Sequence, residues 1–218
     1  MKNHLGKLTT LVAATLLIAT SAHADLYTVG STVNVTVHGV SPKETVRINS
    51  STLGNVNVYA GLVDLTIGGI GNVDALCIDP FQWANSGSFK VANLGDAPVT
   101  REMGAAAASL VSKLWALNYE DAKTNSHKAA GLQIAVWEVV GGAGFSFLND
   151  YLNNVDLGSI ANAMITEATN YQGPGAKLVA LTNREKQDFV VQQVPDGGTT
   201  VLLLGLGLGG LAFFRRRL

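Results

Sequence analysis

The sequence has one cysteine, Cys77, among its 218 residues. A lone cysteine has no partner for a disulfide within the chain, which excludes a small fold held together by disulfides. Histidine is scarce as well, and beyond residue 24 only His38 and His127 remain. These two stand in no spacing that would hold a metal ion, so we expect no metal site and no cofactor.

The chain also lacks a large excess of charge of either sign, because 15 basic residues face 16 acidic ones. Three of the basic residues, Arg215, Arg216 and Arg217, are crowded at the C-terminal end. The rest of the chain is therefore mildly acidic, which argues against nucleic acid as a partner. The glycine-rich stretch 141–144 lacks the strand–loop–helix context of a nucleotide site, and we expect it to end a helix.

The N-terminal segment 1–24 has the layout of a secretory signal peptide. It begins with the basic residues Lys2 and Lys7, continues with an apolar run over 8–19, and ends with the small residues Ala22 and Ala24. This order predicts export and cleavage before residue 25. The alternative is a first core helix.

The C-terminal segment 194–218 has three consecutive parts. It opens with a short motif made of Val194, Pro195, Asp196, Gly197 and Gly198. An uncharged stretch over 199–214 follows, and the three arginines come last. As a helix this stretch spans roughly 24 Å at about 1.5 Å per residue. That is short for a hydrocarbon core of about 30 Å, but the arginines can reach the headgroups, so we expect a transmembrane helix.

This three-part layout resembles the PEP-CTERM sorting signal in its Val-Pro-Asp-Gly/Ser-Gly variant. The resemblance implies recognition by an exosortase at the inner membrane, followed by removal of the helix. The product would then lie at the cell surface or outside the cell. The alternative is a permanent C-terminal anchor.

Between these ends lies one domain, 25–193, of ordinary size. Alternating apolar residues predict strands over most of 27–78, with turns at 39–42, 50–54 and 68–72. Apolar residues at helical spacing predict helices at 103–117, with Thr100 as the N-cap, and at 130–140, 145–152 and 157–171. Short strands follow at 178–181 and 189–192. The fold class we expect is α+β, a β-sandwich or barrel with an inserted helical layer.

Within the helix expected at 130–140, Gln133 is a polar residue in the middle of the apolar face. The other side of this helix carries Gly131, Ala135 and Glu138. A buried carboxamide is unfavourable unless it finds hydrogen-bond partners. Gln133 is therefore expected either to hydrogen-bond in the core or to react.

Cys77 and Gln133 together resemble the pair that defines the bacterial surface thioester domains. The family's cysteine lies in a Cys-Ile/Val-Asp segment, here Cys77-Ile78-Asp79, and its glutamine in a Gln-x-Ala-Ile/Val-Trp helix, here Gln133 to Trp137. The resemblance covers roughly residues 59–140. It departs at Leu132, where the family often has threonine.

The resemblance implies an internal thioester between the sulfur of Cys77 and the side-chain carbonyl of Gln133, with Trp137 and Asp79 as supporting residues. Such a bond can be opened once by a surface amine or hydroxyl, so the expected protein is a covalent adhesin of the surface or polysaccharide matrix and not an enzyme. The alternative function is a non-reactive structural or interaction module of the same matrix. For Cys77 itself the other possibilities are a buried apolar residue, an intermolecular disulfide, or the nucleophile of a hydrolase with His127 as base.

Overall fold

The alternating residues of the first half form one long antiparallel hairpin. In the computed structural model, β1 (Thr32–Ser50) pairs with β2 (Gly54–Ile67) from the register Val35↔Ile67 to Ser50↔Gly54. The turn predicted at 39–42 is wrong, because β1 continues through it and only shifts register there. Gly61 lies opposite this irregularity, where a Cβ atom would stand 2.1 Å from the carbonyl oxygen of Pro42. The close approach of the two backbones explains why a glycine is needed.

The structure describes residues 27–150 and 155–193, which all belong to the compact unit Asp25–Pro195. The predicted signal peptide, the sorting motif, the apolar stretch 199–214 and the terminal arginines lie outside the described residues. Within the described ranges, no helix is long and apolar enough to cross a membrane.

All neighbouring strands of the sheet are antiparallel, in the order β2-β3-β7-β6-β4-β1-β5. Because β2 also pairs with β1, the strands close into a ring with β5 attached outside it. The remaining strands are β3 (Gly71–Cys77), β4 (Gly87–Asn93), β5 (Phe145–Asp150), β6 (Leu178–Thr182) and β7 (Phe189–Gln192). One cluster of buried apolar side chains, including Leu65, Phe89 and Phe189, unites residues of β1, β2, β3, β4, β6 and β7.

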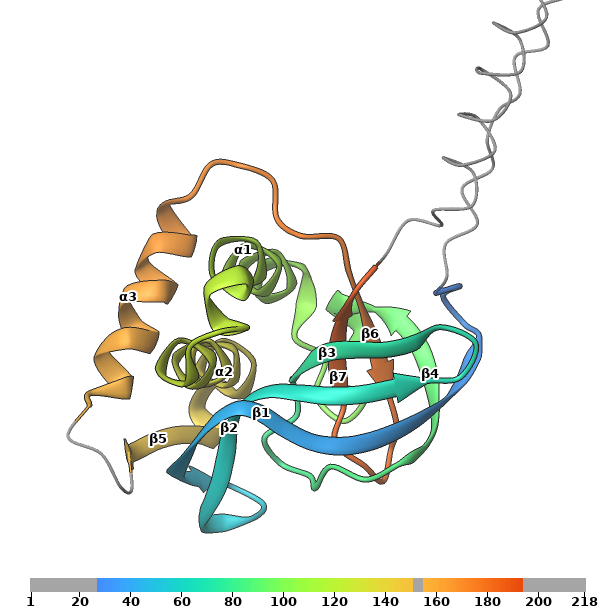
Figure 1. Cartoon of the computed structure of the whole chain (residues 1–218), viewed down its shortest axis with the longest axis horizontal. Helices are drawn as coiled ribbons and strands as arrows, with labels where there is room; N and C mark the ends of the chain where they lie inside the picture. Colours follow the sequence, from blue (N-terminus) through green and yellow to red (C-terminus); the bar gives the residue numbers. More distant parts are fainter. Residues whose placement is uncertain (1–26, 151–154, 194–218) are drawn as a thin grey trace, which may run out of the picture. The chain divides into compact units, whose positions relative to one another are not determined.

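Three helices lie between β4 and β6 in the chain: α1 (Gly104–Ala122), α2 (Ser126–Gly141) and α3 (Leu157–Asn170). A short 3-10 turn, η1 (Leu94–Asp96), precedes α1, and a second, η2 (Gly142–Gly144), follows α2. The helices gather beside the ring of strands (Figure 1), and α2 packs against α1, α3, β1 and β2. The expected combination of a β-structure with an inserted set of helices is therefore confirmed, and the sheet is antiparallel.

Helix α2 begins at Ser126, before the expected start at residue 130, and ends at the glycine stretch as expected. The side chain of Asn125 accepts a hydrogen bond from the backbone N–H of Lys128 at 3.0 Å, and Gly142 ends the helix with φ +49°. The expected two-sided character of this helix is wrong, because Gly131 and Ala135 are also buried. A Cβ atom at Gly131 would lie 2.5 Å from Cγ2 of Ile160, so α3 covers the side of α2 opposite the expected apolar face.

Two other helix predictions need correction. Residues 145–150 form β5 instead of a helix, because they pair with the free edge of β1 in the register Ser50↔Phe145 to Val46↔Asp150. Thr100 does not cap α1, which begins at Gly104. The chain before it is held in turns, since the N–H of Met103 donates to the carbonyl of Ala97 at 2.8 Å.

Candidate functional site

The side chain of Gln133 lies on the backbone of Cys77. The N–H of Cys77 donates to Oε1 of Gln133 at 2.9 Å, and Nε2 of Gln133 donates to the carbonyl oxygen of Cys77 at 2.8 Å. Both residues are almost fully buried, with exposed fractions of 2% and 1%. The two residues that the sequence motifs paired, 56 positions apart in the chain, are therefore in direct contact.

The local strand pattern explains this contact. The pairing of β2 with β3 ends at Val63↔Ala75. Cys77, two residues further along β3, therefore has no partner strand on the β2 side. On the other side, Ile78 donates its N–H to the carbonyl of Asp188, so the polar groups of Cys77 point away from β7. The carboxamide of Gln133 replaces the missing strand and satisfies both groups, as a buried backbone requires.

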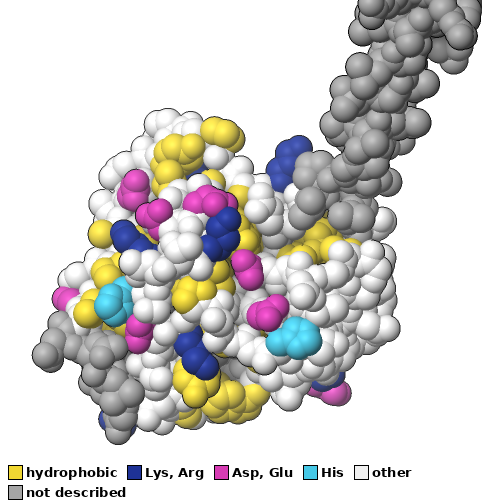
Figure 2. All heavy atoms as spheres, in the orientation of Figure 1, with side chains coloured by type: hydrophobic (Ala, Val, Ile, Leu, Met, Phe, Trp, Pro, Cys, Tyr) yellow, Lys and Arg dark blue, Asp and Glu magenta, His cyan; other side chains and the backbone are white. Residues whose placement is uncertain are grey.

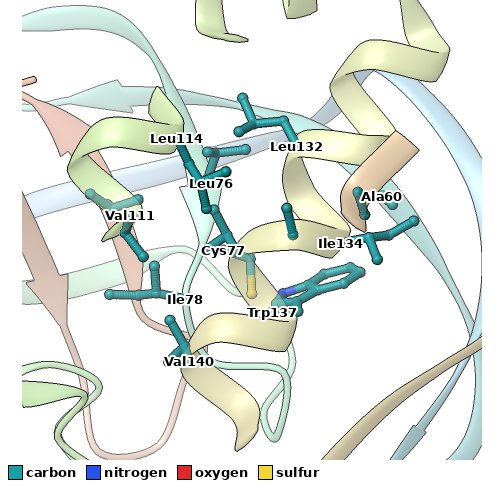
Figure 3. Close-up of a cluster of buried hydrophobic side chains, with 14 of the residues drawn as sticks. Ala60, Leu76, Cys77, Ile78, Val111, Leu114, Leu132, Ile134, Trp137 and Val140 are labelled. Carbon is teal, nitrogen blue, oxygen red and sulfur yellow. The ribbon is translucent and has the colours of Figure 1, made fainter. Parts of the chain in front are cut away.

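The sulfur of Cys77 lies beside the indole of Trp137, one helical turn after Gln133 (Figure 3). Burial raises the pKa of the Cys77 thiol far above its ordinary value, and the charges of Asp79 and Asp188 raise it too, while the nearby indole of Trp137 and the backbone N–H of Asp79 lower it. The indole nitrogen of Trp137 is buried and has no hydrogen-bond partner among the described residues. The thiol is therefore protonated at rest, with two N–H groups near the sulfur.

Two buried carboxyl groups, Asp79 and Asp188, stand next to this thiol. Oδ1 of Asp79 accepts from the N–H of Phe81 at 3.1 Å, whereas its Oδ2 has no partner among the described residues. Asp188 accepts from the N–H groups of Val99 and Asn183 at 2.7 and 2.6 Å. Burial raises the pKa of both carboxyls, and burial together with the negative charge of Asp79 brings that of Asp188 to about 7.

This carboxyl pair predicts that the protein is more stable in mild acid. A carboxyl whose folded-state pKa is raised contributes stability below its unfolded pKa, and this stability is lost as the pH rises through the folded-state value of about 7 for Asp188. Between pH 5 and pH 8 the free energy of unfolding should fall by about 2–4 kcal/mol, since one pKa unit corresponds to about 1.4 kcal/mol. Denaturant unfolding across this pH range measures the fall.

Asp79→Asn is the informative variant, because it keeps an oxygen acceptor for Phe81 and removes the charge near Asp188. Its loss of stability between pH 5 and pH 8 should be clearly smaller than that of the parent. The exposed Asp121→Asn serves as the matched control and should leave the profile unchanged. Equal profiles for the parent and Asp79→Asn would show that the pair does not titrate as described.

Cys77, Gln133 and Trp137 also line a cavity of about 460 Å³. Its walls come from β1, β2, the loop after β3 and the turn between β6 and β7. They include Val40, Ile48, Val58, Tyr59, Pro80, Gln82, Trp83 and Gln187. Tyr59 and Trp83 are each 54% exposed, whereas Cys77 and Gln133 are buried, so the aromatic side chains lie at the mouth of the cavity and Cys77 and Gln133 at its bottom.

The other sequence candidates lie apart from this site. His127 faces Glu44 at 3.5 Å and does not line the cavity around Cys77, so the structure does not support it as a base for a hydrolase. The burial of Cys77 argues against an intermolecular disulfide. Within the described part of the chain, no group of three His, Cys, Asp or Glu residues could hold a metal ion. On the face in Figure 2, acidic and basic side chains are interspersed.

Sequence reasoning missed two residues of the site. Asp188 directly precedes the apolar strand β7, and nothing in its polar neighbourhood distinguishes it from a loop residue. Trp83 belongs to no sequence motif, and it is half exposed at the mouth of the cavity. The sequence signal that could have indicated Trp83 was its position, six residues after the cysteine, just before a polar segment.

Comparisons with known proteins match two parts of the chain. The VPDSG-CTERM motif family matches residues 193–218, the segment that the sequence identified as a sorting signal. This motif points to an exported protein that passes a membrane, and motifs of this type are generally linked to exosortase processing. The sequence matched no curated protein with which it was compared.

Among solved structures, the fold is similar to the N-terminal thioester domain of the fibronectin-binding protein SfbI from Streptococcus pyogenes. The TM-score is 0.45 and the sequence identity 12%, over 71% of this chain and 96% of that domain.

Proposed function

We propose that the domain at 25–193 forms an internal thioester between Cys77 and Gln133 and uses it for covalent adhesion outside the cell. The observation that carries this proposal is the pair of hydrogen bonds that hold the Gln133 carboxamide on the backbone of Cys77, at 2.9 and 2.8 Å. These bonds hold the carboxamide group against the residue that carries the thiol. Proximity of this kind supplies much of the acceleration in intramolecular reactions.

The bond would form by acyl transfer within the chain. The sulfur of Cys77 attacks the side-chain carbonyl carbon of Gln133, the C–S bond forms and the C–N bond breaks. The thiol proton ends on the departing nitrogen, which leaves as ammonia. The N–H of Cys77 already donates to Oε1, the oxygen on which negative charge develops, and one such donor is typically worth about 10²–10³ in rate.

The surroundings would preserve the bond until an acceptor arrives. Trp137 is 3% exposed and packs against Phe145 with ring centroids 5.8 Å apart, so it excludes water from the sulfur side. Opening by an amine or hydroxyl leaves that group attached at Gln133 and frees the thiol. The protein is consumed in this step, so we propose an adhesin and not an enzyme.

The two terminal segments indicate where the domain would act. A signal peptide at 1–24 would start export, and the sorting motif would hold the chain at the inner membrane through residues 199–214 until an exosortase cuts it. The domain would then remain at the cell surface or in the extracellular polysaccharide. Surface amines or hydroxyls are the groups within its reach.

The same hydrogen bonds also favour a second candidate, a non-reactive structural or interaction module of the matrix. A carboxamide that satisfies both polar groups of a strand end needs no chemical role, because a buried backbone without partners is unfavourable by about 1–3 kcal/mol per group. In this case Cys77 is a buried apolar residue and the sulfur never leaves the thiol state.

Methylamine separates the two candidates. Incubation of the purified full-length exported protein with methylamine, followed by peptide mapping, should place one methylamide at residue 133 and reveal one new free thiol at residue 77. The non-reactive module would show the unmodified glutamine and an equal thiol content before and after treatment. That result would exclude the thioester and leave the export assignment intact.

A further inference from the structure

The chemistry of the cavity indicates which acceptor it suits. Among the described residues that line it, none carries a charge. Its polar lining residues are Asn57, Gln82 and Gln187 with Thr45, next to Cys77 and Gln133. Its volume of about 460 Å³ falls within the roughly 300–1,000 Å³ of small-molecule pockets. A neutral ligand with several hydroxyl groups fits this set of donors and acceptors.

One acceptor in the wall is unused. Oε1 of Gln82 is buried and has no hydrogen-bond partner among the described residues, although Nε2 of the same side chain donates to the carbonyl of Arg184 at 3.1 Å. That bond fixes the orientation of the carboxamide, and Gln82 is one of the residues that line the cavity. A buried acceptor without a donor is unfavourable, so a ligand hydroxyl at this position would gain a hydrogen bond and remove the penalty.

The mouth of the cavity disfavours a cationic acceptor. Nζ of Lys43 lies 3.7 Å from the ring centroid of Tyr59, which places a positive charge beside the entrance. A lysine side chain from a partner would approach this charge and would have to lose its own proton in an uncharged pocket. The half-exposed indole of Trp83, by contrast, has a free apolar surface on which the C–H groups of a sugar ring can stack.

We infer that the acceptor of the proposed thioester is a neutral saccharide, which stacks on Trp83, donates a hydroxyl hydrogen bond to Gln82 and presents another hydroxyl to residue 133. This inference rests on the proposed function. The attacking hydroxyl oxygen forms an ester bond to the side-chain carbonyl carbon of residue 133, the C–S bond breaks, and the hydroxyl proton passes to the sulfur of Cys77. The saccharide is then esterified to the protein and the thiol is restored.

The test compares three probes on the purified full-length exported protein: methyl glucopyranoside, Nα-acetyl-lysine and methylamine. Mass spectrometry follows the adduct at residue 133. Trp83→Ala should slow the sugar adduct about tenfold, equivalent to about 1.4 kcal/mol, and leave the methylamine adduct unchanged because methylamine is too small to need the stacking surface. Lys43→Glu is the matched control: it should accelerate the lysine adduct and leave the sugar adduct unchanged.

The outcomes distinguish the inference from the proposed function. Reaction with methylamine but not with the sugar, or equal slowing of both by Trp83→Ala, would overturn the saccharide acceptor and keep the thioester. Loss of all adducts would overturn the thioester. Binding is then measured separately, by titrating methyl glucopyranoside into the Cys77→Ala protein and following tryptophan fluorescence. Saturable binding that Trp83→Ala abolishes supports the saccharide site, and no binding overturns it.

Discussion

Replacing Cys77 with alanine abolishes the incorporation of methylamine at residue 133 and leaves the domain folded. The loss is complete because no other cysteine exists in the chain to form the thioester. The fold is retained because Gln133 bonds to the backbone of residue 77, which alanine preserves. Removing one small buried side chain should lower the free energy of unfolding by only about 1 kcal/mol.

The control for this variant moves the thiol to another place. Ala163 lies on an exposed part of α3, and a chain that carries both Cys77→Ala and Ala163→Cys has one accessible thiol far along the chain from the carboxamide. Methylamine should not label this double variant either. Labelling of residue 133 in either variant would mean that an activated carbonyl arises without Cys77, which contradicts the mechanism.

Replacing Gln133 with leucine strongly destabilises the domain. The comparison is made in the Cys77→Ala background, where no thioester can form and only the hydrogen bonds change. Leucine leaves the N–H and the carbonyl of residue 77 buried and without partners, which should lower the free energy of unfolding by about 2–5 kcal/mol. Chemical denaturation measures the difference, and the exposed Gln172→Leu, expected to stay within about 0.5 kcal/mol, is its control.

Gln133→Glu in the same background sharpens this prediction. A protonated glutamic acid can donate its O–H to the carbonyl of residue 77 and accept from the N–H, so it reproduces both bonds of glutamine. Burial should raise its pKa in the folded state, so the stability it contributes is present in acid and is lost as the pH rises through that raised pKa. If Gln133→Leu and Gln133→Glu were as stable as the parent at pH 7, the carboxamide would not support the strand end.

The sequence predicted the site better than it predicted the elements around it. The pairing of Cys77 with Gln133 was implied by the resemblance of Cys77-Ile78-Asp79 and of Gln133 to Trp137 to the surface thioester domains, and the two residues are in contact. The end of α2 at Gly141 followed from local chemistry, since glycine tolerates the positive φ of the residue that follows. The formation of the thioester itself stays a prediction.

Other features depend on contacts that a single segment cannot reveal. The helix predicted at 145–152 is wrong because the edge of β1 recruits residues 145–150 as a strand, and a short apolar run fits either structure. The burial of Gly131 and Ala135 depends on the position of α3, and the spacing of apolar residues within α2 carries no information about that position. The closeness of Asp79 to Asp188 depends on the register of β3 with β7.

The mass of the untreated protein tests the thioester most directly. Formation of the bond releases ammonia, so the exported protein should weigh about 17 Da less than the mass calculated for its measured termini. The Cys77→Ala protein, prepared in the same way, should have its full calculated mass. A parent protein at full calculated mass, with Gln133 recovered intact in its peptide, would contradict the account.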